Sequence, residues 1–183
     1  MIEVKVGIKG IQPGLLMDSL RIEDIINPPA KPKKYTEEVL QQMAEKALYH
    51  NGQGLFIPNR NVKKCLIQGA QMGRIKLAGR QNLYPFIEAS VFIEPHEIPL
   101  NKTEPDNYIQ IPMRRKDGNV IPKRLPICLD WALEFGLLIY DDEIIDKVKQ
   151  ALEIAGISVG LGNQRPEYGR FEVTQWEVVK EVK

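Results

Sequence analysis

The stretch that decides the fold is residues 127–139, which read ICLDWALEFGLLI. Every odd-numbered position in it is apolar, whereas the even-numbered positions include Asp130, Glu134 and Gly136. Alternation with a period of two over this length predicts one long β-strand with a single buried face. We expect the rest of the chain to be arranged around this strand and the elements that follow it, up to Val179.

A helix and a second strand are predicted downstream of this stretch. Asp141 and Asp142 are suitable N-cap residues, and apolar residues then recur at helical spacing up to Ala155. Gly156 is expected to end the helix, as glycine commonly does just after the last helical turn. The chain then returns as a strand over residues 170–179.

A glycine-rich loop, residues 160–171, joins that helix to that strand. Glycine adopts backbone conformations that other residues avoid, and it lets a partner approach the main chain closely. Two arginines and a tyrosine accompany the glycines, a combination that suits a phosphate backbone and a stacked base. The alternative interpretation is that the glycines only make tight turns and that Arg170 only begins the strand. The predicted nucleic-acid contacts in this loop are Gly160, Gly162, Arg165, Tyr168, Gly169 and Arg170.

A second basic cluster is predicted at the start of a helix over residues 59–72, with Asn59 as its N-cap. Arg60, Lys63 and Lys64 fall in the first turns of this helix. Cations oppose the helix dipole there, but they suit a bound anion, which indicates a phosphate contact. A solvated basic surface is the alternative interpretation.

A third basic cluster lies in a predicted β-hairpin over residues 108–124. Asp117-Gly118 is a strong turn signal for such a hairpin. A basic hairpin that projects from a sheet could clamp a phosphate backbone, although its charges could equally protect an exposed edge from aggregation. The five cations are Arg114, Arg115, Lys116, Lys123 and Arg124.

The remaining patterns complete a fold of the α+β class. Strands are expected over residues 2–9 and 84–94, and a helix is expected to begin after Thr36 and to end near His50. The core order is then strand, helix, strand, strand, helix, strand, which is the βαββαβ order of a ferredoxin-like or RRM-like sheet. We predict a single domain, residues 1–183, with insertions at about 10–57 and 95–125, the second of which contains the hairpin between the middle strands.

Composition sets limits on the class of protein. The chain has 183 residues, of which 43% are hydrophobic and 27% charged, as in an ordinary globular protein. It has no apolar run long enough to span a membrane, and its first residues resemble a strand rather than a signal peptide. Cys65 and Cys128 are expected to be reduced core residues, which fits a cytoplasmic protein. The net charge is only +1, so any surface that binds nucleic acid must be local.

The segments AGISVGLGNQR (155–165) and YGRF (168–171) resemble the glycine-rich loop of the CRISPR-associated RAMP superfamily. The layout is most similar to the backbone subunit that coats the guide RNA, in which a basic hairpin lies between the middle strands. The segment LFIPNRNVK (55–63) is similar to that subunit's basic entry into the first helix. The chain departs from the family in its shortness and low net charge, which suggests a stand-alone relative from a phage or another mobile element.

The sequence does not favour catalysis. RNA-processing members of the superfamily use a histidine, whereas His50 and His96 lie outside the glycine-rich loop here. No cofactor is expected, because the cysteines and histidines lack metal-ligand spacing and the glycine-rich loop lacks a Gly-Lys-Ser/Thr ending.

Three functions follow, in order of preference. The first is non-catalytic binding of single-stranded nucleic acid, with RNA preferred over DNA. The protein is then expected to associate with further copies of itself along the strand, or with other subunits. The second is a protein-assembly module of a phage or mobile element that binds no nucleic acid, and the third is a metal-independent ribonuclease. Salt separates the first two, since phosphate binding weakens steeply as salt rises.

Overall fold

The computed structural model describes residues 1–19, 24, 26–115 and 117–181. Its strands are β1 (Ile2–Gly10), β2 (Leu15–Leu16), β3 (His50–Asn51), β4 (Gly54–Pro58), β5 (Val91–Glu94), β6 (Glu97–Pro99), β7 (Asn107–Arg114), β8 (Val120–Cys128), β9 (Ala132–Ile139) and β10 (Phe171–Glu181). Its α-helices are α2 (Glu37–Lys46), α3 (Asn59–Met72), α4 (Tyr84–Ser90) and α5 (Ile145–Ser158), and 3₁₀ turns occur at Ala78–Arg80 and Asp142–Ile144.

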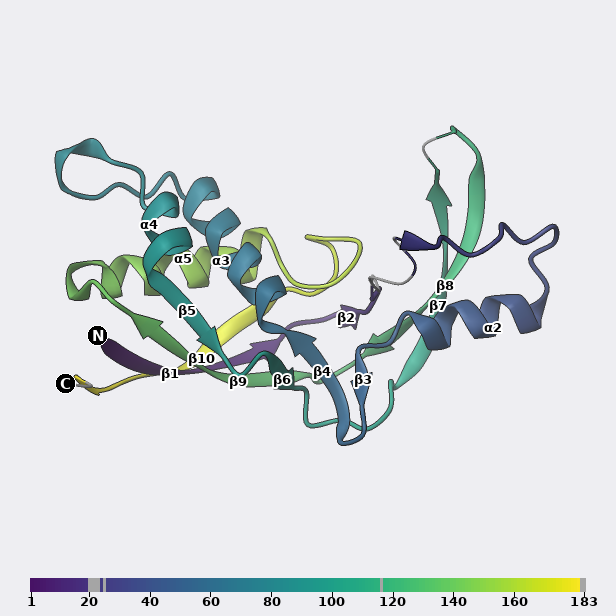
Figure 1. Ribbon diagram of the computed structural model, residues 1–183, viewed down its shortest axis with the longest axis horizontal. Helices are drawn as coiled ribbons and strands as arrows, with labels where there is room; N and C mark the ends of the chain where they lie inside the picture. The colour runs from purple at the N-terminus through teal and green to yellow at the C-terminus, as the bar shows by residue number, and fades with distance from the viewer. Residues whose placement is uncertain (20–23, 25, 116, 182–183) are drawn as a thin grey trace.

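The central sheet is antiparallel and has the strand order β10-β1-β9-β5. Helix α3 connects the first core strand to the second, α5 connects the third to the fourth, and both helices cover the same face of the sheet (Figure 1). This order and layering confirm the predicted ferredoxin-like fold, including the β7–β8 hairpin between the middle strands.

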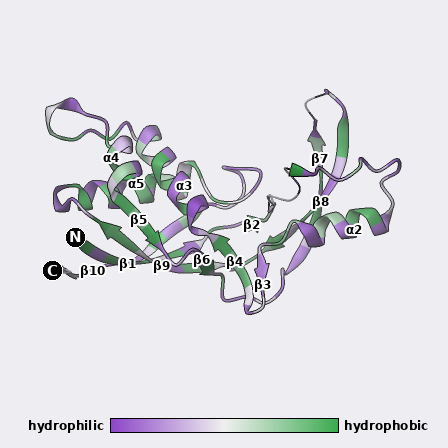
Figure 2. Ribbon diagram, in the orientation of Figure 1, coloured by the Kyte–Doolittle hydropathy of each residue, from purple (hydrophilic) through white to green (hydrophobic). Residues whose placement is uncertain are grey.

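Alternating apolar residues fix which face of this sheet is covered. Val4, Val6 and Ile8 of β1 are buried against the helices, whereas Lys5 and Lys9 are exposed on the opposite face. In Figure 2 the hydrophobic residues concentrate in β5 and β9 and recur along α5. Both cysteines are buried and free, as expected from the sequence.

Three smaller elements lie beside this core. Strands β3, β4 and β6 form one sheet, and β2, β8 and β7 form another, over which α2 packs. A second apolar cluster of Leu16, Ala47, Leu125 and Ile127 holds α2 to β2 and β8. These elements occupy the segments predicted as insertions and make the molecule elongated, with the hairpin at the far end from the two termini (Figure 1). The predicted boundaries of the single domain stay a prediction.

The prediction of one strand over residues 127–139 was wrong, because the chain bends between β8 and β9. Asp130 has a positive φ of 45°, and the Leu129 amide donates a hydrogen bond to the Asp106 carboxylate at 2.7 Å. The two halves therefore belong to different sheets, β8 to the hairpin sheet and β9 to the central one.

The prediction of a strand over residues 84–94 was wrong in its first part, since Tyr84–Ser90 forms helix α4. Pro85 lies in its first turn, where its fixed φ favours a helix and its missing amide hydrogen does no harm. Leu83 and Ile87, four residues apart, are both fully buried. Burial at this helical spacing explains why the segment is not a strand.

The expected ends of three helices also need correction. Thr36 is an N-cap as predicted, but α2 ends at Lys46, so His50 lies in β3 and not at a helix end. Pro58 rather than Asn59 occupies the N-cap position of α3, and the Asn59 side chain donates to the Ile93 carbonyl oxygen. Gly156 does not end α5, which continues to Ser158.

Among the described residues, no helix is both long and apolar enough to cross a membrane.

Candidate nucleic-acid interface

The glycine-rich loop folds back onto the protein through its main chain. The Leu161 amide donates to the Gly169 carbonyl oxygen, and the Gly169 amide donates to the Gly14 carbonyl oxygen, each at 2.8 Å. Gly169 has a φ of 77°, and a Cβ atom there would lie 1.7 Å from the Leu161 carbonyl oxygen. A Cβ atom on Gly162 would lie 2.2 Å from the Leu16 carbonyl oxygen. The glycines are therefore needed for close backbone packing inside the protein, which is the alternative that the sequence left open.

The three larger residues predicted to bind nucleic acid from this loop have different surroundings. Arg165 is exposed, and its Nη1 atom donates to Gln68 Oε1 at 3.2 Å. Tyr168 is partly buried and packs against the second apolar cluster. Arg170 donates from Nη2 to the Gln12 carbonyl oxygen at 3.3 Å, and its Nε atom is buried. Of the two arginines, Arg165 exposes its charge more fully to solvent.

The three cations predicted on α3 differ in their exposure to solvent. Arg60 and Lys64 are exposed, as a phosphate contact requires. Lys63 instead donates from Nζ to the carbonyl oxygens of Ile87, at 2.6 Å, and Val91, at the end of α4. Burial lowers the pKa of Lys63, although the nearby Glu88 opposes this effect. The prediction that Lys63 holds a phosphate conflicts with this use of its ammonium group in the fold.

The cations of the hairpin likewise differ, because some form close ion pairs within the protein and others do not. Lys123 forms an ion pair with Asp18 at 2.6 Å, and Arg124 forms one with Glu37, at the start of α2, at 2.8 Å. Arg115 pairs only loosely with Asp117, at 3.8 Å, and Arg114 is exposed. Lys116 lies outside the described residues.

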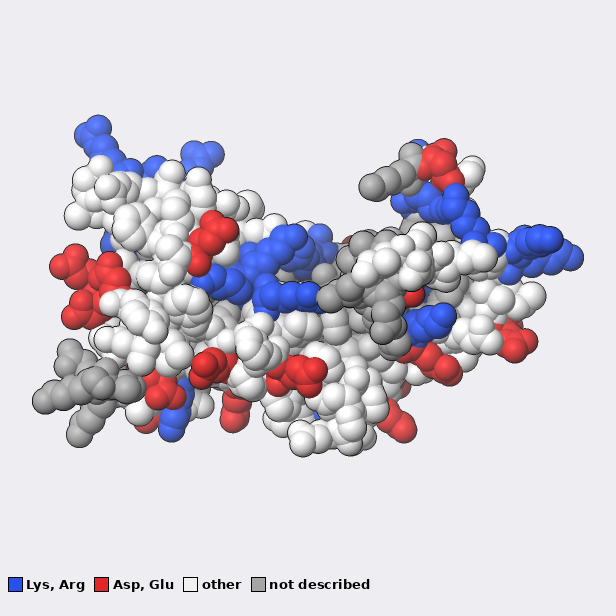
Figure 3. All heavy atoms as spheres, viewed as in Figure 1, with Lys and Arg blue, Asp and Glu red and all other residues white. Residues whose placement is uncertain are grey.

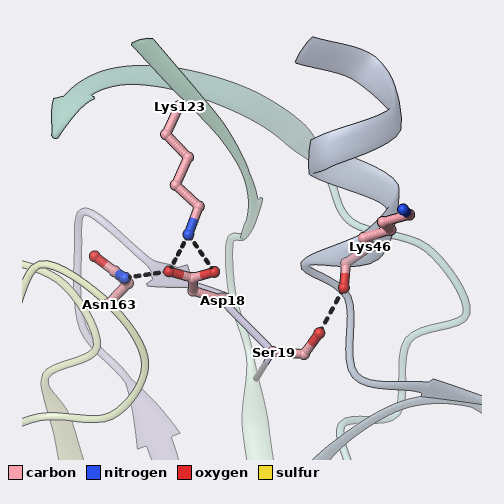
Figure 4. Close-up of polar contacts among 5 residues, drawn as sticks. All are labelled: Asp18, Ser19, Lys46, Lys123 and Asn163. Carbon is pink, nitrogen blue, oxygen red and sulfur yellow. Dashed lines mark hydrogen bonds and ion pairs between the residues drawn. The ribbon is translucent and has the colours of Figure 1, made fainter. Parts of the chain in front are cut away.

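The Asp18 carboxylate links the hairpin to the glycine-rich loop (Figure 4). It accepts from Lys123 on β8, and it also accepts from Asn163 Nδ2 at 2.7 Å. The next residue, Ser19, donates from its hydroxyl to the Lys46 carbonyl oxygen at the end of α2, at 2.6 Å. These contacts set the position of the loop relative to the hairpin and to α2.

A cavity of about 190 Å³ opens beside this network, between the loop and α3. We call it the basic cavity, because Lys64 and Arg165 both line it. Tyr49 and Asn61 line it as well, and the Asn61 amide lies 3.5 Å from the Tyr49 hydroxyl. Asp18 is the only carboxylate among the lining residues that the structure describes, and Lys123 already neutralises it.

Sequence reasoning predicted Lys64 and Arg165 but missed Tyr49, Asn61 and Asp18. Asn61 lies within the polar entry to α3, between two predicted cations, which is a usable signal. Tyr49 and Asp18 lie in segments whose local patterns give no indication of a site.

Other basic residues gather on the face of the molecule that Figure 3 shows. Figure 3 shows Lys and Arg gathered in the middle of this view, where α3 and the glycine-rich loop meet. They gather again over the β7–β8 hairpin and the stretch before α2, whereas acidic residues lie mainly at the left and along the lower edge. A chain of net charge +1 thus carries a locally basic face.

The open face of the central sheet is chemically different. RRM domains stack bases on aromatic residues of the central strands. Here the outward positions of β1 include Glu3, Lys5 and Lys9, and those of β9 include Glu134 and Leu138. No aromatic side chain points outward from these two strands, so β1 and β9 lack the means for stacking of that kind.

Neither histidine lies at the basic cavity. His50 lines a separate cavity with Glu45, Glu104 and Tyr108, and His96 contacts the Asn59 amide through Nδ1 at 3.1 Å. Within the described part of the chain, no group of His, Cys, Asp and Glu side chains is arranged to hold a metal ion.

No family model matches the chain, and no curated protein matches it either. Among solved structures, it is similar to a chain of the Type III-B Cmr-beta bound to cognate target RNA, determined by cryo-EM, with a TM-score of 0.57 and 15% sequence identity. The alignment covers 98% of this chain and 61% of the other, so this chain spans about three fifths of that length. At this identity the likeness shows a shared fold.

Proposed function

We propose that this protein binds single-stranded RNA without catalysis, with a phosphate of the strand held at the basic cavity. The observation that carries the proposal is the convergence of Lys64 and Arg165, from α3 and the glycine-rich loop, on one small cavity. Among the described residues that line the cavity, the only carboxylate is that of Asp18, which Lys123 and Asn163 already engage. A phosphate would complete the charge balance, and the Tyr49 hydroxyl and the Asn61 amide could donate to its oxygens.

The strand would continue from this cavity toward the hairpin. Arg114 and Arg115 lie at the tip of the β7–β8 hairpin. The stretch before α2 adds three exposed lysines, Lys31, Lys33 and Lys34. Cations spaced along one face attract a polyanion and release its counterions, which makes the affinity depend strongly on salt. A strand longer than one site would let several copies bind side by side, as the resemblance to a guide-RNA backbone subunit implies.

Two observations favour this mode over others. The similarity to a chain solved with target RNA supports RNA over DNA. Histidine, which RNA-processing members of the superfamily use as a general acid or base, is not among the described residues that line the basic cavity, so we propose binding without catalysis.

Protein assembly without nucleic acid is the second candidate, and one observation favours it. Phe92 and Tyr140 are 50% and 61% exposed and pack edge to face at the β5 edge of the central sheet. Exposed aromatic residues of this kind are enriched at protein interfaces. An interface built on them would tolerate salt, whereas phosphate binding would not.

The test is fluorescence anisotropy of a labelled single-stranded RNA, and of DNA of the same sequence, at low and at physiological salt. The variant Lys64→Gln/Arg165→Gln removes two charges from the basic cavity. The control Lys5→Gln/Lys9→Gln removes two exposed charges from the open sheet face. We expect salt-sensitive binding that the first variant weakens and the control retains. Equal binding by both variants would contradict the proposed site, and no binding at low salt would turn attention to protein partners.

A further inference from the structure

A second and larger cavity, of about 690 Å³, also lies against the glycine-rich loop. Gln68, Gln71 and Met72 of the last turns of α3 form one wall, and Asn163, Gln164 and Arg165 of the loop form another. We call it the amide cavity. It shares Asn163 and Arg165 with the basic cavity, so the two are adjacent.

The lining of the amide cavity is rich in neutral groups that both donate and accept hydrogen bonds. Four carboxamide side chains line it, and no carboxylate does among the residues described there. Gln71 and Gln164 are exposed, and neither side chain hydrogen-bonds to the described residues. Each carboxamide presents one acceptor oxygen and two donor hydrogens, the pattern that matches the edge of a nucleobase.

The amide cavity also has room and an apolar surface for a base. Its volume falls within the range of roughly 300–1,000 Å³ that is usual for small-molecule sites. Met72 is 63% exposed, which is high for so large an apolar side chain. A thioether makes favourable contacts with aromatic rings, so this wall could cover the face of a base while the amides meet its edge.

Arg165 connects the two cavities. Its Nη1 atom is held by Gln68 Oε1 at 3.2 Å and by the Gly160 carbonyl oxygen at 3.4 Å. A guanidinium has five N–H donors, so these two contacts orient the group and leave other donors for a phosphate. Gln68 therefore belongs to the amide cavity and at the same time fixes the cation that lines the basic cavity.

We propose that the amide cavity binds one unpaired base of the RNA whose neighbouring phosphate lies between Lys64 and Arg165. This inference rests on the proposed function and adds a base-recognition site to it. The base is read through hydrogen bonds to Gln71 and Gln164. The protein then has an affinity for bases as well as for the phosphate backbone, and the two can be separated experimentally.

The experiment compares a labelled single-stranded RNA with an abasic strand of the same length and backbone, by anisotropy at one fixed salt concentration. The variant is Gln71→Ala/Gln164→Ala, and the matched control is Gln42→Ala/Gln150→Ala, which replaces two exposed glutamines elsewhere on the helices. The wild type and the control are expected to prefer the RNA over the abasic strand. In the variant this preference should shrink by about fivefold or more, since a net hydrogen bond contributes about 1 kcal/mol.

The outcomes separate this inference from the proposed function. If the wild type binds both strands equally, or if the variant keeps the full preference, the base site is refuted while salt-sensitive phosphate binding still stands. If neither strand binds, the proposed function has failed, and the base site fails with it. Loss of affinity for both strands alike in the variant would also refute base recognition, because the glutamines would then act only on the backbone.

Discussion

Replacing Gly156 with alanine tests the packing that places the glycine-rich loop. Gly156 lies inside α5, where alanine favours the helix by about 1 kcal/mol. A Cβ atom there, however, would lie 2.2 Å from the Phe171 carbonyl oxygen and 2.8 Å from its ring. The oxygen belongs to strand β10, so relief requires α5 and β10 to separate by about 1 Å. Such overpacking costs about 3 kcal/mol when the neighbour is backbone, which leaves a net loss of about 2 kcal/mol.

The loss can be measured by urea unfolding followed by tryptophan fluorescence. Trp131 is 1% exposed and packs against Phe171 with ring centroids 6.3 Å apart, so its emission reports on this interface. The control is Gly52→Ala, where a Cβ atom would meet nothing within 4 Å and stability should change by less than about 0.5 kcal/mol. If Gly156→Ala were as stable as the wild type or more so, helix propensity would outweigh the contact, and the reasoning would be refuted.

Three further predictions concern the charged contacts. Lys63→Ala removes the donor to the carbonyl oxygens at the end of α4, so amide hydrogen exchange in α4 should accelerate about tenfold. Unchanged exchange would contradict the role of Lys63 in stabilising this helix. A double-mutant cycle of Asp18→Asn and Lys123→Met should give a coupling energy of about 1 kcal/mol in unfolding experiments, since both side chains are about four-fifths buried. A coupling energy of zero would refute the link between the hairpin and Asp18. The Lys102 ammonium, with the Leu129 amide also contributing, holds the pKa of Asp106 below its ordinary value of 3.8. The stability that this carboxylate contributes is present above pH 3.8 and is lost as the pH falls through the lower pKa of the folded state. Asp106→Asn should therefore flatten the acid end of a plot of unfolding free energy against pH. A plot parallel to that of the wild type would contradict this role.

Local patterns predicted the order of the core elements well, for a physical reason. The alternation in β1 and β9, the N-cap at Thr36 and the turn at Asp117-Gly118 are each decided by residues close together in sequence. The bend at Asp130 could not be predicted because every odd-numbered residue stays apolar across it, although the two sides enter different sheets. Helix α4 was missed because it is short and its last carbonyl oxygens are capped by Lys63, more than twenty residues earlier in the chain.

In the candidate site too, features set by nearby residues could be predicted, whereas contacts between distant segments could not. The sequence predicted three basic clusters, but it could not tell which cations the fold itself uses. Lys123 and Asp18 are 105 residues apart, and no pattern in either segment indicates that they meet. Lys64 and Arg165 come together only because α3 and the glycine-rich loop lie on the same side of the sheet.

The measurement that tests the central claim most directly is a map of the cross-links formed by ultraviolet light between the protein and a single-stranded RNA that contains 4-thiouridine. The account predicts cross-linked peptides from the glycine-rich loop, residues 160–169, and from α3, and their loss in Lys64→Gln/Arg165→Gln. Cross-links confined to the outward face of β1 and β9 would contradict it, because the strand would then lie on the open sheet and not at the basic cavity.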